Sequence, residues 1–180
     1  RAVRSVTAFG SVSGGSMIFI KKLTASSSGT LSFVNGSSDV VLDSTYKEYV
    51  FTLNNMHPQT SGNNPKMTAS TNTGSSYGVT VTTTDFRATH DESGGSTGVT
   101  YRTATDLAQS TDPVHIFGGT GTGNENDECA VGIIHLFNPS STTFVKHFIA
   151  RTHGYSDDDR AYSNFSAGYF NTTSAIDAIQ

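Results

Sequence analysis

Residues 130–137, Ala130-Val-Gly-Ile-Ile-His-Leu-Phe137, determine the fold class more than any other stretch of the chain. The run is almost continuously apolar and rich in β-branched side chains, and Asn138-Pro139 ends it. It is too short for an ordinary helix, and β-branched residues pack well in strands. The run therefore predicts a strand that is buried on both faces.

The segments on either side of this run show the same strand pattern. Alternating apolar and polar residues, separated by Gly, Ser, Asn and Pro turns, predict further strands. These cover residues 17–23, 30–34, 46–54, 66–71, 77–90, 99–103, 113–117, 143–152, 161–171 and 176–180. We expect a hairpin between the first two. A β-bulge is expected near residues 84–86, where the alternation shifts.

The composition points to the same fold class. The 180 residues include 24 Ser, 26 Thr and 18 Gly, whereas charged residues make up only 14%. Such a chain is poor in helix formers, while its 11 Phe and 7 Tyr supply large core side chains. We therefore predict an all-β protein, an antiparallel β-sandwich or jelly roll of about ten short strands.

Charge and cysteine content narrow the function classes. The net charge of −4 disfavours nucleic-acid binding, which needs a basic face. No apolar run reaches the roughly 18 residues of a spanning helix, so membrane insertion is not expected. Cys129 is the only cysteine and cannot form an internal disulfide. Stability must therefore come from packing, metal binding or oligomerisation.

The sequence divides into two regions. Residues 1–16 mix small polar residues with scattered valines and end in Gly14-Gly15-Ser16, which predicts an extended N-terminal arm. A frayed terminus is the alternative for this segment. Residues 17–180 are expected to form the β-sandwich domain. Because the chain stops inside a predicted strand, C-terminal truncation is also expected.

Two acidic loops are the candidate metal sites. Asp157, Asp158 and Asp159 lie in one loop, and Asp127 and Glu128 in another. Calcium takes six to eight oxygen ligands, which neighbouring acidic loops could supply. Neither loop has the alternating acidic order of a helix-flanked calcium loop, so the alternative is two solvated loops. No cofactor is expected.

Histidines offer a second metal hypothesis. His135 lies six residues from Cys129, and His147 lies six residues from His153, so each pair would share a strand face. Neither spacing matches a structural zinc site. His135 is expected to be a hydrogen-bonded core residue.

Catalytic motifs are weak. The chain has no Gly-x-Ser-x-Gly elbow, and its only glutamates are Glu48, Glu92, Glu125 and Glu128. We therefore predict that the protein is not an enzyme. A glycan-active enzyme with paired carboxylates stays as a minority alternative.

Several phrases resemble short virion structural proteins of marine tailed bacteriophages, including cyanophages. The strongest are Asn126-Asp-Glu-Cys129, His135-Leu-Phe-Asn-Pro-Ser-Ser-Thr-Thr-Phe-Val-Lys-His-Phe148 and Gly168-Tyr-Phe-Asn-Thr-Thr-Ser-Ala-Ile-Asp177. Weaker ones occupy residues 20–30, 42–51, 55–58 and 106–110. The resemblance spans residues 17–180 and carries no catalytic residue. It implies a tail-fibre-like structural protein of the extracellular phage particle.

Two roles follow from this resemblance. In the first, the chain is an exposed tail-fibre or appendage domain that aids host adsorption, with residues 118–128 and 154–160 contacting a host glycan or protein. In the second, it is a capsid decoration protein that residues 1–16 anchor to other virion proteins. A homotrimer is expected in either case, because many weak contacts act together in a symmetric particle. Aromatic residues in an exposed groove would favour carbohydrate binding, whereas a flat apolar patch would favour decoration.

Overall fold

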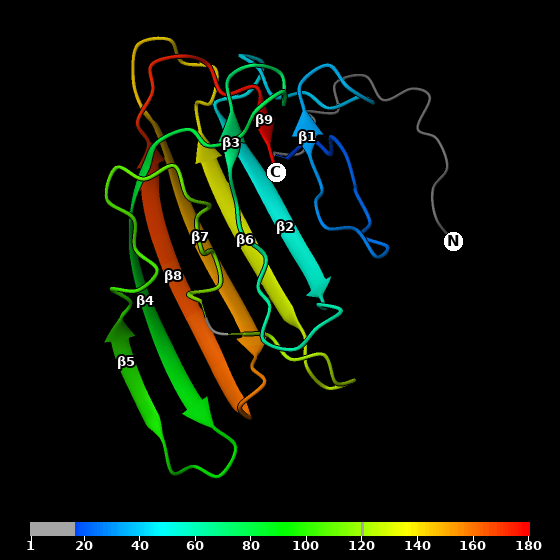
Figure 1. The fold of residues 1–180 in the computed structure, drawn as a ribbon. Coiled ribbons are helices and arrows are strands. Elements are labelled where there is room, and N and C mark those ends of the chain that lie inside the picture. The colour runs from blue at the N-terminus through cyan, green and yellow to red at the C-terminus, as the bar shows by residue number, and fades with distance from the viewer. Residues whose placement is uncertain (1–16, 120) are drawn as a thin grey trace, which may run out of the picture.

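The computed structural model describes residues 17–119 and 121–180, and this part of the chain is all-β (Figure 1). In chain order the strands are β1 (Phe33–Val34), β2 (Glu48–Met56), β3 (Ala69–Ser70), β4 (Val81–Asp91), β5 (Thr97–Tyr101), β6 (Ala130–Phe137), β7 (Lys146–Tyr155), β8 (Arg160–Phe170) and β9 (Ala178–Ile179). None of the described residues belongs to a helix that could cross a membrane. The expected N-terminal arm lies outside the described residues.

The strands form two antiparallel sheets. The large sheet has the order β2-β6-β7-β8-β4-β5, and the small sheet has the order β1-β9-β3. Because β6, β7 and β8 are consecutive in the chain and adjacent in space, they form a meander at the centre of the large sheet (Figure 1). The two sheets confirm the predicted all-β sandwich.

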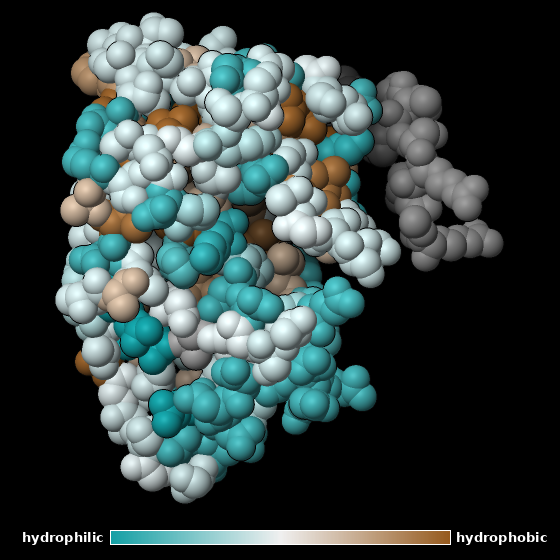
Figure 2. Space-filling view, viewed as in Figure 1, coloured by the Kyte–Doolittle hydropathy of each residue, from teal (hydrophilic) through white to brown (hydrophobic). Residues whose placement is uncertain are grey.

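The core lies between the large sheet and a second layer made of the small sheet and long loops. Leu136, Phe148 and Phe170 point inward from the large sheet and are buried. Val114 and Phe117, on the loop after β5, cover them together with residues of the small sheet. Figure 1 shows this loop crossing in front of the large sheet, and Figure 2 shows that the outer surface of this side is mostly polar.

Three local predictions are wrong. Residues 17–23 and 113–117 form no strand, although Val114 makes a single bridge to Met67. In 30–34, only Phe33–Val34 is a strand. Residues 17–23 and 30–34 therefore do not form the expected hairpin. The apolar side chains still find burial, because Ile116 and Phe117 reach the core from a loop. Apolar content alone did not distinguish a core loop from a strand.

The expected β-bulge at residues 84–86 is also absent, because β4 pairs with β8 in one unbroken register from Val81 to Asp91. The apparent shift arises because Asp85 points inward while Phe86 points outward. At these two positions the polar residue lies inside and the apolar residue lies outside. The side chains still alternate regularly between the two faces of the sheet. The bulge that the structure does contain lies in β2, between Leu53 and Met56.

The predicted burial of residues 130–137 on both faces is also wrong. Ala130, Ile134 and Leu136 are buried, whereas Val131 and Ile133 are exposed. The strand lies inside the sheet, between β2 and β7. However, the second layer covers only one of the two faces of the sheet.

Polar side chains also lie in the interior. The buried carboxylate of Asp85 accepts hydrogen bonds from Thr105 Oγ1 at 2.7 Å and Ser166 Oγ at 2.9 Å. The buried ammonium of Lys146 donates to the carbonyl oxygens of Thr172 at 3.0 Å and Ser174 at 2.6 Å. Burial lowers the pKa of Lys146. These bonds tie loop segments to the large sheet. They also give each buried charge a partner, without which its burial would be costly.

Replacing Asp85 with alanine should therefore destabilise the fold. The change removes the acceptor of the Ser166 hydroxyl and leaves the Thr105 hydroxyl with a longer bond of 3.3 Å to the Arg102 carbonyl, and we expect the free energy of unfolding to fall by about 2–3 kcal/mol. Urea denaturation measures this loss. Asp112→Ala is the matched control, because Asp112 is exposed and accepts one bond from Ser110. Equal losses in the two variants would contradict a structural role for the Asp85 cluster.

Stability should also fall at alkaline pH. Burial raises the pKa of Tyr162, and the Thr122 hydroxyl at 2.8 Å from its phenol oxygen opposes this shift. In the unfolded chain the phenol ionises near pH 10, whereas in the folded chain it keeps its proton to higher pH. Its contribution to stability is therefore complete below pH 10 and is lost as the pH rises further. Urea midpoints between pH 8 and 12 should show this loss, and Tyr162→Phe should make it less steep.

Candidate functional site

The uncovered face of the large sheet is the candidate functional site. Alternation along each strand sends one set of side chains inward and the other set outward, as β7 shows most clearly with alternate buried and exposed residues. We call the outward set the open face. It comprises Glu48, Val50 and Thr52; Thr82, Thr84, Phe86, Ala88 and His90; Thr97, Val99 and Tyr101; Val131, Ile133, His135 and Phe137; His147, Ile149, Arg151, His153 and Tyr155; and Ala161, Ser163, Phe165, Ala167 and Tyr169.

Large apolar side chains are unusually exposed on the open face. Ile149, at the centre of the sheet, is 53% exposed, and Val99, at its edge, is 73% exposed. Phe86, Tyr101, Val131 and Ile133 belong to the same exposed group. Exposed apolar residues gathered on one face are typical of a binding surface. The sequence already indicated apolar residues on this face, because both the inward and the outward positions of β6 are apolar. We interpreted this pattern as burial on both faces.

An aromatic row crosses the open face from β5 to β7. Tyr101 lies opposite Phe86 in the register, and Phe86 lies opposite Phe165. The rings of Phe86 and Phe165 are stacked, with centroids 4.9 Å apart and planes 7° apart. The guanidinium of Arg151 lies 5.1 Å from the centroid of Phe165, within cation–π range. The row therefore combines apolar area with a fixed positive charge.

A shallow groove of about 480 Å³ lies beside this row. Small side chains at Ala167 and Thr84 form its low floor, while His147 and Tyr169 stand beside it, with ring centroids 5.8 Å apart. The lining is Thr82, Thr83, Thr84, Phe137, His147, Phe148, Ile149, Ala167, Gly168 and Tyr169. Its exposed surface is almost entirely apolar, because ring faces and aliphatic atoms rather than hydroxyl groups face the groove. No carboxylate belongs to this lining.

Hydrogen bonds hold one wall of the groove in place. The side-chain amide of Gln109 donates to Thr82 Oγ1 at 2.6 Å and to the Tyr169 hydroxyl at 3.3 Å. Its carbonyl oxygen accepts a bond from Asn171 at 2.5 Å. Gln109 belongs to the loop after β5, so this loop reaches around to position groove residues. Sequence analysis did not identify Gln109, because its role depends on contacts far along the chain.

The histidines lie on the open face rather than in the core. The His135 side chain is 40% exposed, and its Nδ1 lies 2.5 Å from a carboxylate oxygen of Glu48, so it is hydrogen-bonded as predicted but is not a core residue. His147 and His153 share this face, as their even spacing predicted. They lie about 20 Å apart along the strand, which is too far for one metal ion. Among the outward residues of the six strands, Glu48 is the only carboxylate.

The structure brings together the two loops that were expected to contact a host. The backbone amide of Asp157 donates to the carbonyl oxygen of Gly121 at 3.2 Å, and Thr122 and Ser156 form a bridge. Residues 118–128, apart from residue 120, and 154–160 thus form one loop cluster. The Thr122 hydroxyl also bonds to the buried Tyr162, which attaches the cluster to the inner side of the large sheet.

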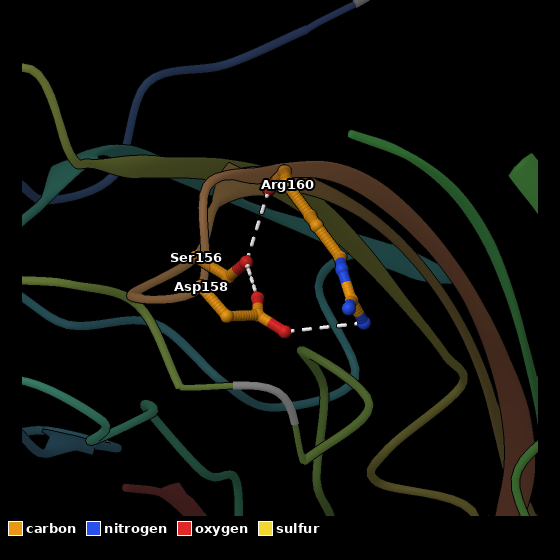
Figure 3. Close-up of polar contacts among 3 residues, drawn as sticks. All are labelled: Ser156, Asp158 and Arg160. Atoms are coloured by element: carbon orange, nitrogen blue, oxygen red, sulfur yellow. Dashed lines mark hydrogen bonds and ion pairs between the residues drawn. The ribbon is translucent and has the colours of Figure 1, made fainter. Parts of the chain in front are cut away.

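Two of the three calcium candidates in the first acidic loop already have protein partners. The Asp158 carboxylate contacts the Ser156 hydroxyl, and its Oδ2 lies 3.1 Å from the Arg160 guanidinium (Figure 3). The Tyr155 hydroxyl donates to Asp159 at 3.3 Å.

In the second acidic loop, Glu128 is buried and accepts a bond from the backbone amide of Glu125 at 2.7 Å, whereas Asp127 is exposed. Within the described ranges, no group of three His, Cys, Asp or Glu side chains is arranged to hold a metal ion. The calcium hypothesis for these residues stays a prediction.

Comparisons of the chain with protein-family models, with curated proteins and with solved structures find no match.

Proposed function

We propose that the chain is a bacteriophage virion structural protein, a tail-fibre or appendage domain that aids host adsorption by binding a surface glycan in the groove of the open face. One observation carries the glycan contact: aromatic rings border an exposed, shallow groove of the large sheet. Sugars present apolar C–H faces, which can stack on rings such as those of His147 and Tyr169. The resemblance of residues 17–180 supports the virion assignment.

The polar surface chemistry agrees with this role. The chain has no disulfide, and its surface is rich in Ser, Thr, Asn and Gly, which suits a domain exposed on a particle. The groove is shallow, so each copy would bind weakly. Many copies on one particle would turn weak contacts into firm attachment. The homotrimer expected from the sequence stays a prediction, and the two-fold contact proposed for the β5 edge would give a dimer in its place.

A specific observation favours the second role, a capsid decoration protein. Val131 and Ile133 form an exposed apolar patch on β6, outside the groove. Such a patch could pack against a neighbouring virion protein. In this role residues 1–16 would anchor the domain to the shell.

Substitutions in the groove test the proposed glycan contact. We expect Tyr169→Ala and His147→Ala each to weaken binding to bacterial surface polysaccharides by about tenfold, because aromatic anchors dominate binding surfaces. A microarray of neutral and anionic polysaccharides, probed with the full chain, measures this. Phe144→Ala is the matched control, because Phe144 is exposed but lies outside the groove. Absence of binding by the wild type, or equal loss in the control, would contradict the glycan proposal.

The location of the chain tests the virion assignment separately. Cryo-electron microscopy of intact particles should show its density on the tail or its fibres. Density spread over the icosahedral shell would instead favour the decoration role. Density in neither place would overturn the virion assignment, whatever the outcome of the glycan experiment.

A further inference from the structure

The outer edge of β5 offers unpaired backbone groups. Arg102 donates its amide to the Asp85 carbonyl at 2.9 Å, and Asp91 donates to the Ser96 carbonyl at 3.0 Å. In an antiparallel ladder, hydrogen-bonded positions alternate. Thr100 and Gly98 therefore bond to β4, whereas Thr97, Val99 and Tyr101 direct their N–H and C=O groups away from it. No strand of the described chain lies on that side.

This edge lacks the protection that edge strands normally carry. Exposed edges are usually blunted by charges, prolines, bulges or a covering segment. The other edge of the sheet, β2, follows this rule: it begins at Glu48 and ends in the bulge between Leu53 and Met56. β5 reads Thr-Gly-Val-Thr-Tyr, without charge or proline, and all of its residues are exposed. Its pairing to β4 has no register shift.

We propose that β5 pairs antiparallel with β5 of a second copy of this chain, so that the large sheets of the two copies become one continuous sheet. The free positions are spaced evenly around Val99. A two-fold axis at Val99 sets Thr97 against Tyr101 of the partner copy, and Val99 against its own counterpart. In this register every free N–H and C=O group of the edge meets a partner.

The side chains fit this arrangement as well as the backbone does. Val99 and Tyr101, which are 73% and 49% exposed, would each gain a cross-strand neighbour. The two open faces would lie on the same side of the joined sheet, with the two aromatic rows offset on opposite sides of the axis. This contact is independent of the groove, so it stands or falls separately from the proposed glycan binding.

Self-complementarity is the reason to choose a second copy as the occupant of this edge. The free N–H and C=O groups of β5 are arranged symmetrically about Val99. A β5 strand related by a two-fold axis can therefore form hydrogen bonds with all of them. Residues 1–16 of another copy could also add to the edge as a strand. The experiments below distinguish these two occupants.

Charge substitutions at Val99 test the two-fold register. We expect the wild-type full chain to dimerise with increasing concentration in sedimentation velocity. Val99→Lys and Val99→Glu should each weaken the dimer by about tenfold or more, because like charges would face each other across the axis. An equimolar mixture of the two variants should restore dimers. Thr52→Lys, an exposed open-face position on β2 outside the groove, is the control and should dimerise like the wild type.

A proline substitution tests the backbone contact. The Val99 amide points away from β4, so Val99→Pro removes an edge donor while leaving the β4 ladder intact. We expect a monomer whose circular dichroism spectrum matches that of the wild type. If this variant fails to fold, the charge variants still decide the question.

Three outcomes would overturn the proposal. The first is a wild-type chain that stays monomeric at every concentration. The second is a mixture of the Lys and Glu variants that assembles no better than either alone. The third is assembly that survives the Val99 substitutions but is lost when residues 1–16 are deleted, which would assign the contact to that segment.

Discussion

Alternation along the strands of the large sheet constrains everything else in this molecule. Each strand sends neighbouring side chains to opposite faces, and both faces receive apolar residues. The small sheet and the loops provide one covering layer, which is used on the inner side. The open face therefore keeps exposed isoleucine, valine and aromatic side chains. In this protein, surface available for binding follows directly from having two apolar faces and one layer to cover them.

The inner layer depends on polar bonds as much as on apolar packing. Short strands and long loops cover the inner side, and loops bring backbone groups that need partners. Asp85 holds Thr105, Thr152 Oγ1 donates to the Ile116 carbonyl at 2.8 Å, and Lys146 caps two carbonyls near the end of the chain. These buried groups fix the loops against the sheet. The loops that are hydrogen-bonded to the inner side of the large sheet therefore support the strands of the open face.

Two surfaces of the large sheet carry the proposed contacts, and they differ in kind. The groove presents side-chain surface, namely aromatic rings and aliphatic groups around Ala167. The edge of β5 presents backbone chemistry, namely N–H and C=O groups at alternate positions. A joined sheet would place two grooves on one side of an assembly. Weak binding at each groove would then be strengthened by geometry, which is the principle on which virion appendages with many copies depend.

The sequence alone determined the class of structure and most of the strands. Period-2 alternation, turn residues and β-branched runs are local signals, so 46–54, 143–152 and 161–171 were recognisable as strands without knowledge of their partners. Which face is covered is a non-local property, and only the tertiary structure decided it. It exposed Ile133 and His135, buried Asp85 and Lys146, and brought Gln109 to the groove. The physical reason is that alternation specifies two faces, whereas the rest of the chain decides which face water reaches.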